Sequence, residues 1–246
     1  MSHLIVQVVL DTPLDFCFDY RYPVASEDTQ LPQVGQLIVV PFGRRTEVGL
    51  VVGIKNHSEV NEKKLKDALS LVEGVPPLHR EWIDLCRFAA SYYQRSLGEV
   101  ALPSIPKKIR HLGKLALKRA LKSLDEKNGK FLSEREEKPQ LHQAQQNAVS
   151  AIMHSCGFAP YVLYGVTGSG KTEIYLHSIE QVLDRSPDAQ ILVMVPEINL
   201  TPQLETSVCN RFPHENIATL HSRLTESERL KNWLKIASGK ARIILG

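Results

Sequence analysis

Residues 165–172 constrain this chain more than any other part of its sequence. They read Gly-Val-Thr-Gly-Ser-Gly-Lys-Thr and match the pattern G-x-x-x-x-G-K-[ST] at every fixed position. Glycines permit positive φ angles, which turn successive backbone N–H groups toward one point. An apolar run precedes the loop and a helical pattern follows it, as this motif requires. The loop therefore predicts a nucleoside-triphosphate site at the start of a helix.

The residue types of the loop suit distinct tasks at such a site. Backbone N–H groups at a helix N-terminus bind phosphate, Lys171 would reach the β- and γ-phosphates, and the Thr172 hydroxyl would hold Mg²⁺. We expect Lys171 and Thr172 to be the catalytic pair. The expected cofactor-binding residues of the loop are Gly165, Val166, Thr167, Gly168, Ser169, Gly170, Lys171 and Thr172. By itself the loop does not distinguish one nucleoside triphosphate from another.

Strand and helix patterns alternate from residue 141 onward. We expect strands over 161–164, 190–195, 217–220 and 242–245, with helices over 172–183, 200–211 and 226–238 between them. This βαβ pattern predicts a parallel sheet, and the unbroken apolar run 190–195 indicates a sheet covered on both faces. The sequence ends directly on a strand pattern, so we expect the sheet to be incomplete and the chain to be part of a longer protein.

The first hundred residues have a different pattern. Short runs rich in β-branched and aromatic residues, at 4–10, 16–22, 36–42 and 46–55, are punctuated by Gly and Pro and predict a small antiparallel sheet or barrel. A helix is expected over 78–95. Its predicted buried stripe is Trp82, Leu85, Phe88, Ala89 and Tyr92.

A basic stretch lies between these two parts, from 106 to 139. It has two interpretations: a solvated linker with one exposed helix, or a strip of lysines along a DNA backbone. The residue patterns predict an α/β fold with a β-rich domain at 1–105, a basic linker at 106–139 and an incomplete P-loop lobe at 140–246. The family resemblance described below implies that the lobe is RecA-like and offers a reduced winged-helix remnant as the alternative for 106–139.

Composition limits the setting of the protein. A net charge of +3 and a pI near 8.6 permit nucleic-acid binding without requiring it. The four cysteines are widely separated and have no metal-ligand spacing, so we expect reduced, mostly buried thiols. The N-terminus does not resemble a signal peptide, and no run approaches the length of a membrane span. These features predict a cytoplasmic protein with no membrane partner.

Residues around the loop resemble superfamily 2 helicases. Leu141 and Gln145 resemble the Q motif, in which a glutamine hydrogen-bonds the adenine edge. The segment 196–203 follows a predicted strand and resembles motif Ia, which contacts the sugar-phosphate of single-stranded DNA, and His221-Ser222 resembles the next DNA-contacting element. The residues expected to contact DNA on this basis are Pro196, Glu197, Thr201, Gln203, His221 and Ser222.

The ordered motifs Gly-Val-Thr-Gly-Ser-Gly-Lys-Thr-Glu, Val-Pro-Glu-Ile, Leu-Thr-Pro-Gln, Leu-His-Ser and Ser-Glu-Arg closely resemble the PriA family of replication-restart helicases, also called primosomal protein N′. Phe18-Asp19-Tyr20 and Val-Pro-Phe-Gly at 40–43 are similar to that family's 3′-end-binding domain. The resemblance implies a pocket lined by Phe18, Asp19, Tyr20, Gly43 and Lys66.

The chemistry of these five residues suits a strand end. An aromatic ring stacks on a base, a carboxylate accepts from a free 3′ hydroxyl and repels a 3′ phosphate, and Lys66 neutralises a backbone phosphate. Without the resemblance, Phe18 and Tyr20 read as ordinary strand residues.

The resemblance implies an ATP-dependent 3′-5′ DNA helicase that recognises stalled or abandoned replication forks and restarts replication by primosome assembly. Its cofactors would be ATP and Mg²⁺. Its partners would be forked and single-stranded DNA, the nascent-strand 3′ end, other primosome proteins and single-strand-binding protein. A P-loop kinase or small GTPase fits poorly, because neither accounts for 196–203 or for the β-rich domain.

The sequence departs from the family pattern in two respects. Only about 35 residues stand where the family has a winged-helix domain. The D-E-x-H motif, the second motor lobe and the cysteine-rich zinc site lie outside this chain. The alternative is therefore a DNA-end-binding and nucleotide-binding protein without ATP hydrolysis or helicase activity.

Overall fold

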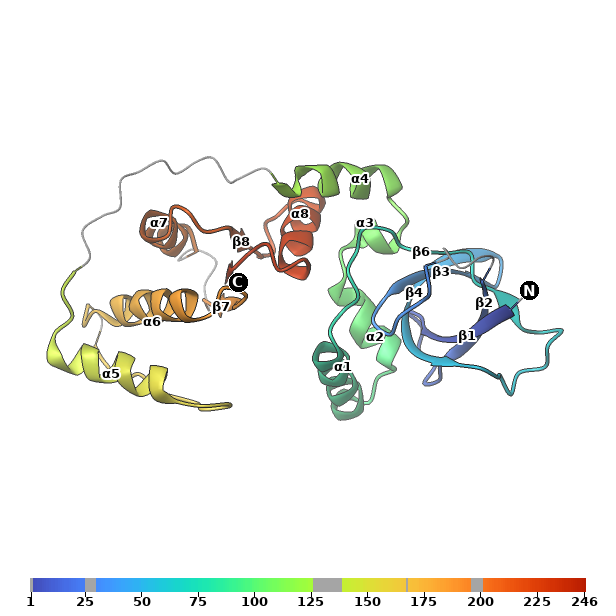
Figure 1. Cartoon of the computed structure of the whole chain (residues 1–246), viewed down its shortest axis with the longest axis horizontal. Helices are drawn as coiled ribbons and strands as arrows, with labels where there is room; N and C mark the ends of the chain where they lie inside the picture. Colours follow the sequence, from blue (N-terminus) through green and yellow to red (C-terminus); the bar gives the residue numbers. More distant parts are fainter. Residues whose placement is uncertain (1, 25–29, 126–138, 167, 196–200) are drawn as a thin grey trace. The chain divides into compact units, whose positions relative to one another are not determined.

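A computed structural model describes residues 2–24, 30–125, 139–166, 168–195 and 201–246 (Figure 1). The chain divides into two compact units. The first comprises Met1–Leu124 with Leu224–Ser238, and the second comprises Asp125–Arg223 with Gly239–Gly246. The fold is α/β, with a β-rich N-terminal part followed by a parallel-sheet part, as the sequence predicts.

A six-stranded sheet forms the centre of the first unit. Its order is β5-β2-β1-β4-β3-β6, and its four long strands pair antiparallel. The strands are β1 (Ser2–Val9), β2 (Phe18–Val24), β3 (Leu37–Phe42), β4 (Arg45–Lys55), β5 (Lys66–Asp67) and β6 (Ser70–Leu71). Only Ala68 and Leu69 separate β5 from β6, although these strands occupy opposite ends of the order. The backbone N–H groups of Ala68 and Leu69 donate to Arg21 O and Val39 O, respectively. The chain thus passes directly from one edge of the sheet to the other and closes it into a small barrel.

Alternation along the strands separates two hydrophobic clusters. Ile38 and Val40 of β3 join Val6, Val8 and Tyr20 in one cluster. The intervening residues of β3, Leu37 and Val39, instead join the cluster formed with the helices. Successive side chains of a strand point to opposite faces, so one set fills the barrel and the other binds the helices to it.

Helix α1 (Arg80–Tyr93) buries a different face from the one predicted. Ile83, Cys86 and Ala90 are buried, whereas Phe88 and Tyr92 are 66% and 69% exposed. Leu85 is exposed as well, while Trp82 is partly buried against the core. The helix carries two apolar stripes, and periodicity does not say which of them meets a neighbour. The smaller Cys86 and Ala90 allow the closer approach to the barrel.

Residues 107–124 belong to the core of the first unit, so a solvated linker is the wrong interpretation for them. Two short helices, α2 (Leu97–Ala101) and η1 (Leu102–Ser104), precede this stretch. The stretch itself forms α3 (Lys107–Arg110), α4 (Lys114–Lys122) and η2 (Ser123–Asp125). Ile109, Leu117 and Ala120 of α3 and α4 are buried in the same cluster as Leu37 and Leu50 of the barrel. The remainder of the basic stretch, 126–138, lies outside the described residues.

A three-stranded parallel sheet with order β7-β9-β8 lies in the second unit. Its elements are α5 (Gln143–His154), α6 (Lys171–Arg185), β7 (Ile191–Val193), α7 (Thr201–Arg211), β8 (Ile217–Thr219) and β9 (Ile243–Leu245). Ile179 of α6 and Val208 of α7 pack with Ile243 and Leu245 of β9 in one cluster. Tyr175, predicted on the buried face of α6, is 44% exposed.

One strand prediction for this unit is wrong, and a second strand is covered differently from the prediction. Residues 161–164 form no strand, and Val162 and Tyr164 are 95% and 98% exposed. A strand requires a hydrogen-bonded neighbour, and in the part of the chain that the structure describes none pairs with this segment. The run at β7 is covered on one face only, because Leu192 and Met194 are 60% and 76% exposed.

Helix α8 (Glu226–Ala237) follows β8 and precedes β9 in the sequence but packs in the first unit. Leu230 and Leu234 are each 1% exposed and lie in the cluster with Ile109 and Leu117. The predicted inward face is therefore correct for these leucines. The predicted location is wrong, since α8 packs against α3 and α4 rather than on the parallel sheet.

Two further expectations concern cysteines and membranes. All four thiols are free; Cys86 and Cys209 are buried, but Cys17 and Cys156 are exposed, contrary to expectation. Among the helices described, none combines the length and apolarity needed to cross a bilayer.

Candidate nucleotide and DNA sites

The phosphate-loop motif forms the entry to α6. Gly170 is the N-cap residue with φ 77°, and Gly168 has φ 81°, both in the left-handed region that favours glycine. No side chain caps this helix. The N–H groups of its first turn therefore have no side-chain acceptor, which is the arrangement that receives a phosphate.

Lys171 lies across the loop. Its Nζ donates to Gly165 O at 2.7 Å and to Val166 O at 2.8 Å, while Thr172 is exposed beside it. An ammonium group held by two carbonyls and an uncapped helix start together form a cationic, donor-rich site. These residues fit a nucleoside triphosphate with Mg²⁺, although Thr167 lies outside the described residues.

Gln145 of α5 connects its helix to the loop. The side chain is 8% exposed, and its Nε2 donates to Gly170 O at 3.3 Å. Its Oε1 accepts from His142 N at 3.0 Å and completes a capping box. Both ends of the amide thus have protein partners, so reading an adenine would require an exchange of partners. That role stays a prediction.

Gly170 has a packing role beside Gln145. A Cβ atom built at Gly170 would lie 2.3 Å from Gln145 Nε2. Glycine is therefore required here both for the left-handed φ and for the close approach of the amide. The sequence motif predicts the first requirement, and only the folded chain shows the second.

Two of the other predicted DNA-contacting residues, His221 and Ser222, lie near the carboxyl ends of the parallel strands. Thr219, Leu245 and Val193 are in register, so β7, β8 and β9 end at one edge of the sheet. His221 and Ser222 follow β8 at this edge; Ser222 is exposed, and His221 Nδ1 accepts from Arg223 N at 3.2 Å. Pro196 and Glu197 lie outside the described residues, as do the side chains of Thr201 and Gln203, whose backbone begins α7.

Aromatic residues surround one end of the barrel. The ring of Phe18 lies 5.2 Å from that of Phe42 and 4.8 Å from that of Phe16, measured between centroids. Tyr20 is 4% exposed, and its hydroxyl donates to Pro41 O at 3.2 Å. Closure of the barrel, rather than direct strand pairing, therefore brings Phe18 and Tyr20 of β2 beside the end of β3 that leads into Gly43.

Lys66 joins this group through β5. The parallel pairing of β2 and β5 sets Lys66 opposite Tyr20, and the Lys66 side chain is exposed. Gly43 has φ 59°, and a Cβ atom there would meet nothing within 4 Å, so the backbone at this turn is open. The structure thus places Phe18, Tyr20 and Lys66 on two paired strands, and Gly43 in the turn that follows Phe42.

Asp19 is the exception among the five predicted end-pocket residues. Adjacent residues of a strand point to opposite faces, so Asp19 faces away from Phe18 and Tyr20. Its Oδ2 accepts from Ser58 Oγ at 2.6 Å. The end-binding role predicted for Asp19 stays a prediction. The alternation of side chains along β2 is the sequence signal that separates Asp19 from Phe18 and Tyr20. Phe42, which the prediction did not include, contacts Phe18 directly.

Comparison with known families gives two matches in one chain. Residues 7–106 match the PriA 3′DNA-binding domain (3′BD), and residues 142–246 match the DEAD/DEAH box helicase family. The first range contains the aromatic end of the barrel, and the second contains Gln145 and the phosphate loop.

The chain is similar to proteins named replication restart protein PriA. It is 33% identical to the one from Haemophilus influenzae, with 98% of this chain and 41% of the relative covered. It is 31% identical to the one from Treponema pallidum (98% and 35% covered) and 46% identical to the one from Bacillus subtilis (35% and 10% covered). The chain belongs to the PriA family. It spans about two fifths or less of the length of these relatives.

The PriA relatives differ in length within the aligned part. The alignment with the Haemophilus protein runs over 311 positions, which is 65 more than the 246 residues of this chain. The alignment with the Treponema protein runs over 246 positions. The Haemophilus relative therefore carries residues within the aligned part that this PriA-family chain lacks.

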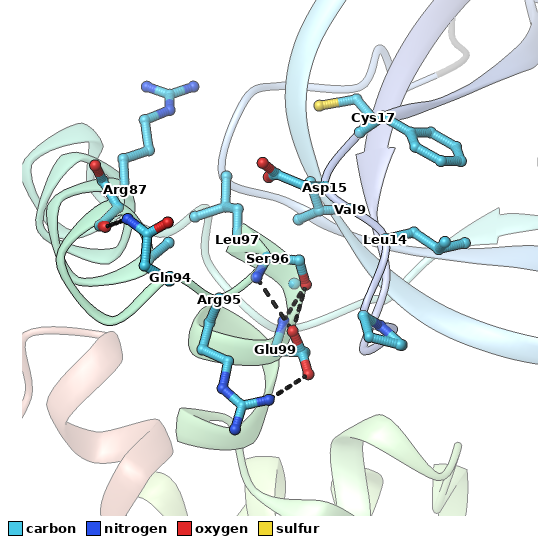
Figure 2. Close-up of a pocket in the computed structure, with 15 residues that line it drawn as sticks. Val9, Leu14, Asp15, Cys17, Arg87, Gln94, Arg95, Ser96, Leu97 and Glu99 are labelled. Atoms are coloured by element: carbon cyan, nitrogen blue, oxygen red, sulfur yellow. Dashed lines mark hydrogen bonds and ion pairs between the residues drawn. The ribbon is translucent and has the colours of Figure 1, made fainter.

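Two grooves flank the barrel of this PriA-family chain. The first, of about 610 Å³, lies between residues 13–17 and α1. Figure 2 shows Asp15 and Cys17 on one wall and Arg87 on the other. Its arginines have acidic partners: Arg95 Nη1 lies 3.4 Å from Glu99 Oε1, and Arg87 Nη1 lies 2.9 Å from Asp84 Oδ1. Burial raises the pKa of the Cys17 thiol, which keeps it protonated near neutral pH.

The second groove, of about 480 Å³, begins at the barrel end described above. Phe42 and Gly43 line it, together with Arg44, Arg45 and Arg110. It therefore adjoins the aromatic group around Phe18 through Phe42. Among the described residues, no group of three or more histidine, cysteine or acidic side chains could hold a metal ion.

Proposed function

We propose that this chain is the DNA-end-binding and ATP-binding part of an ATP-dependent 3′-5′ DNA helicase that recognises stalled or abandoned replication forks and restarts replication. The observation that carries the proposal is the presence of a PriA 3′DNA-binding domain and a helicase domain with an intact phosphate loop in one chain. The printed name of the relatives, replication restart protein, supports the same process.

The nucleotide would be ATP with Mg²⁺. In this proposal the loop N–H groups and Lys171 bind the phosphates, Thr172 holds the metal, and Gln145 reads the adenine. The uncapped start of α6 supports the phosphate roles. Bound Mg²⁺ would neutralise charge developing on the transferred phosphoryl group.

The DNA contacts would come from both units. Phe18, Tyr20, Gly43 and Lys66 would receive a nascent-strand 3′ end, with Asp19 accepting from the 3′ hydroxyl. The residues proposed to touch the translocating single strand are Pro196, Glu197, Thr201, Gln203, His221 and Ser222. We further propose a cytoplasmic protein that acts on forked DNA with other primosome proteins and single-strand-binding protein.

The end-binding proposal is tested with forked DNA that carries a free 3′-OH leading end or the same fork with a 3′ phosphate. We expect tighter binding to the 3′-OH fork, because a phosphate adds charge beside Asp19. Fluorescence anisotropy measures both affinities. Asp19→Ala should remove the preference, and Glu81→Ala, at an exposed carboxylate of α1 outside both grooves, should retain it. Equal affinity of the unaltered chain for both forks overturns end recognition.

The nucleotide proposal is tested by Lys171→Ala. We expect loss of binding of a fluorescent ATP analogue, since the ammonium partner of the phosphates is removed. Lys118→Ala, at an exposed lysine of α4, should bind the analogue as the unaltered chain does. Retained binding by the Lys171→Ala protein would count against the site.

A second candidate is a nucleotide-binding, DNA-end-binding protein that does not hydrolyse ATP. The residues of this chain supply the phosphate loop but no D-E-x-H motif, so this candidate describes what the purified 246 residues would do by themselves. Without that acidic group, transition-state charge and the attacking water have too few partners. DNA-stimulated phosphate release by the purified chain distinguishes the two candidates, and measurable turnover excludes the second.

A further inference from the structure

The groove that begins at Phe42 and Gly43 contains cationic side chains without partners. Arg44 and Arg45 form the tip of the β3–β4 hairpin, and both are exposed. Among the described residues, neither arginine side chain has a hydrogen-bond or ion-pair partner, although the Arg45 backbone pairs with Phe42 of β3. Two unneutralised guanidinium groups on one turn raise the local positive potential, and each presents several N–H donors to an anion.

A third arginine lies on the opposite wall and is held in place. Arg110 Nη1 lies 3.1 Å from Asp11 Oδ2, and its Nε donates to Ile105 O at 3.1 Å. Its side chain is 17% exposed. These contacts fix the direction of the guanidinium group, so it loses little conformational freedom on binding a ligand. Asp11 and Glu47 reduce the positive charge of the groove but do not cancel it.

The two grooves described above differ in their free charge. In the first groove Arg87 and Arg95 already face Asp84 and Glu99, so an anion would have to displace a carboxylate. In the second groove, Arg44 and Arg45 would gain an anion without losing a partner. An anionic polymer is therefore expected to follow the second groove.

The location of the second groove beside the aromatic group indicates which anion it binds. The groove shares Phe42 with the aromatic group in which Phe18 stands 5.2 Å away, and the turn at Gly43 is open. We infer that the groove binds the phosphodiester backbone of the DNA strand whose 3′ end enters that aromatic pocket, with Arg44 and Arg45 on the phosphates nearest the end. The inference rests on the proposed end-binding function and extends it to the path of the strand.

The experiment measures binding of the full 246-residue chain to 3′-OH single strands over a range of salt concentrations. The double variant Arg44→Ala/Arg45→Ala should weaken binding about tenfold, and the slope of log affinity against log salt should fall by about 1.4 for two lost phosphate contacts. Arg87→Ala, at an arginine of the first groove, is the matched control and should change neither quantity.

Strands with one neutral methylphosphonate linkage then locate the contacts. Neutralising the first or second linkage from the 3′ end should weaken binding by the unaltered chain and have little further effect on the double variant. A linkage near the 5′ end should have no effect on either protein. Loss of affinity with Arg87→Ala and none with the double variant would place the strand in the other groove and overturn the inference.

The outcomes also separate this inference from the end-binding proposal. If the double variant weakens binding equally at every linkage position and 3′ phosphate strands bind as well as 3′-OH strands, end recognition fails and the groove is a non-specific DNA site. If 3′-OH preference persists and the double variant binds normally, end recognition stands and the groove inference is wrong.

Discussion

Tyr20 shows how one buried side chain serves the fold and limits the site. Its ring lies in the barrel cluster, and its hydroxyl donates to Pro41 O at 3.2 Å. Burial raises the pKa of Tyr20 to about 12. The phenol therefore stays neutral in the folded chain and contributes to the candidate end pocket mainly by supporting Phe18 and Phe42.

The raised pKa of Tyr20 predicts an alkaline loss of stability. In the unfolded chain the phenol ionises near its ordinary value of 10, whereas the folded chain keeps the proton until about pH 12. The unfolded state thus binds fewer protons between these values, so stability falls as pH rises through this window, by about 2–3 kcal/mol in total. Urea unfolding of Tyr20→Phe at pH 8 to 12 should show a flatter profile than the unaltered chain. Parallel profiles would contradict the assignment.

Helix α2 shows how a five-residue element is fixed by its surroundings. Ser96 caps it, accepting from Glu99 N at 3.3 Å and donating to Thr12 O at 2.5 Å. Gly98 brings the helix against the barrel, where a Cβ atom would lie 1.7 Å from Leu10 O. Such a helix is too short to be stable alone, so its packing against the end of β1 determines its position.

Two glycine substitutions separate packing from backbone strain. Gly98→Ala should destabilise the first unit by about 3 kcal/mol, because its methyl group would collide with a backbone carbonyl that has little room to move. Gly43→Ala should cost only about 1–2 kcal/mol, since the positive φ is strained but the space is open. Denaturant midpoints measure both values. Equal costs would mean that α2 shifts to accommodate the methyl group.

At the scale of the whole chain, sequence order and packing do not coincide. Helix α8 lies between two strands of the parallel sheet in the sequence, yet Leu230 and Leu234 pack with α3 and α4 in the first unit. The basic stretch that contains α3 and α4 thereby gains a second set of apolar neighbours. The first unit is consequently assembled from two separate parts of the chain, Met1–Leu124 and Leu224–Ser238.

This arrangement predicts which unit responds to a core deletion in α8. Leu234→Ala should cost about 2–5 kcal/mol and raise amide exchange in β3, β4 and α4, because the cavity lies in the cluster they share. Ile179→Ala, a matched deletion in α6, should instead raise exchange in β7 and β9. Hydrogen exchange by mass spectrometry distinguishes these patterns. Faster exchange of β7 and β9 in Leu234→Ala would show that α8 supports the parallel sheet.

The sequence predicts much of the secondary structure. The four long strands of the barrel and the helices α6, α7 and α8 begin and end within a few residues of their expected bounds. The exception at 161–164 is instructive. Its residues have strand propensity, but a strand exists only where a neighbour accepts and donates hydrogen bonds, and the described chain provides none.

What the sequence determined by itself is the phosphate loop and the order of elements. Both depend on interactions within a few residues: the positive φ of Gly168 and Gly170, and the periods of apolar side chains. Only the tertiary structure decided the exposed face of α1, the unit in which α8 packs, and the contact of Gln145 with Gly170. Each of these features depends on which distant segment supplies the opposing surface. The hydrophobic effect is non-directional, so an apolar face in the sequence does not specify the segment against which it is buried.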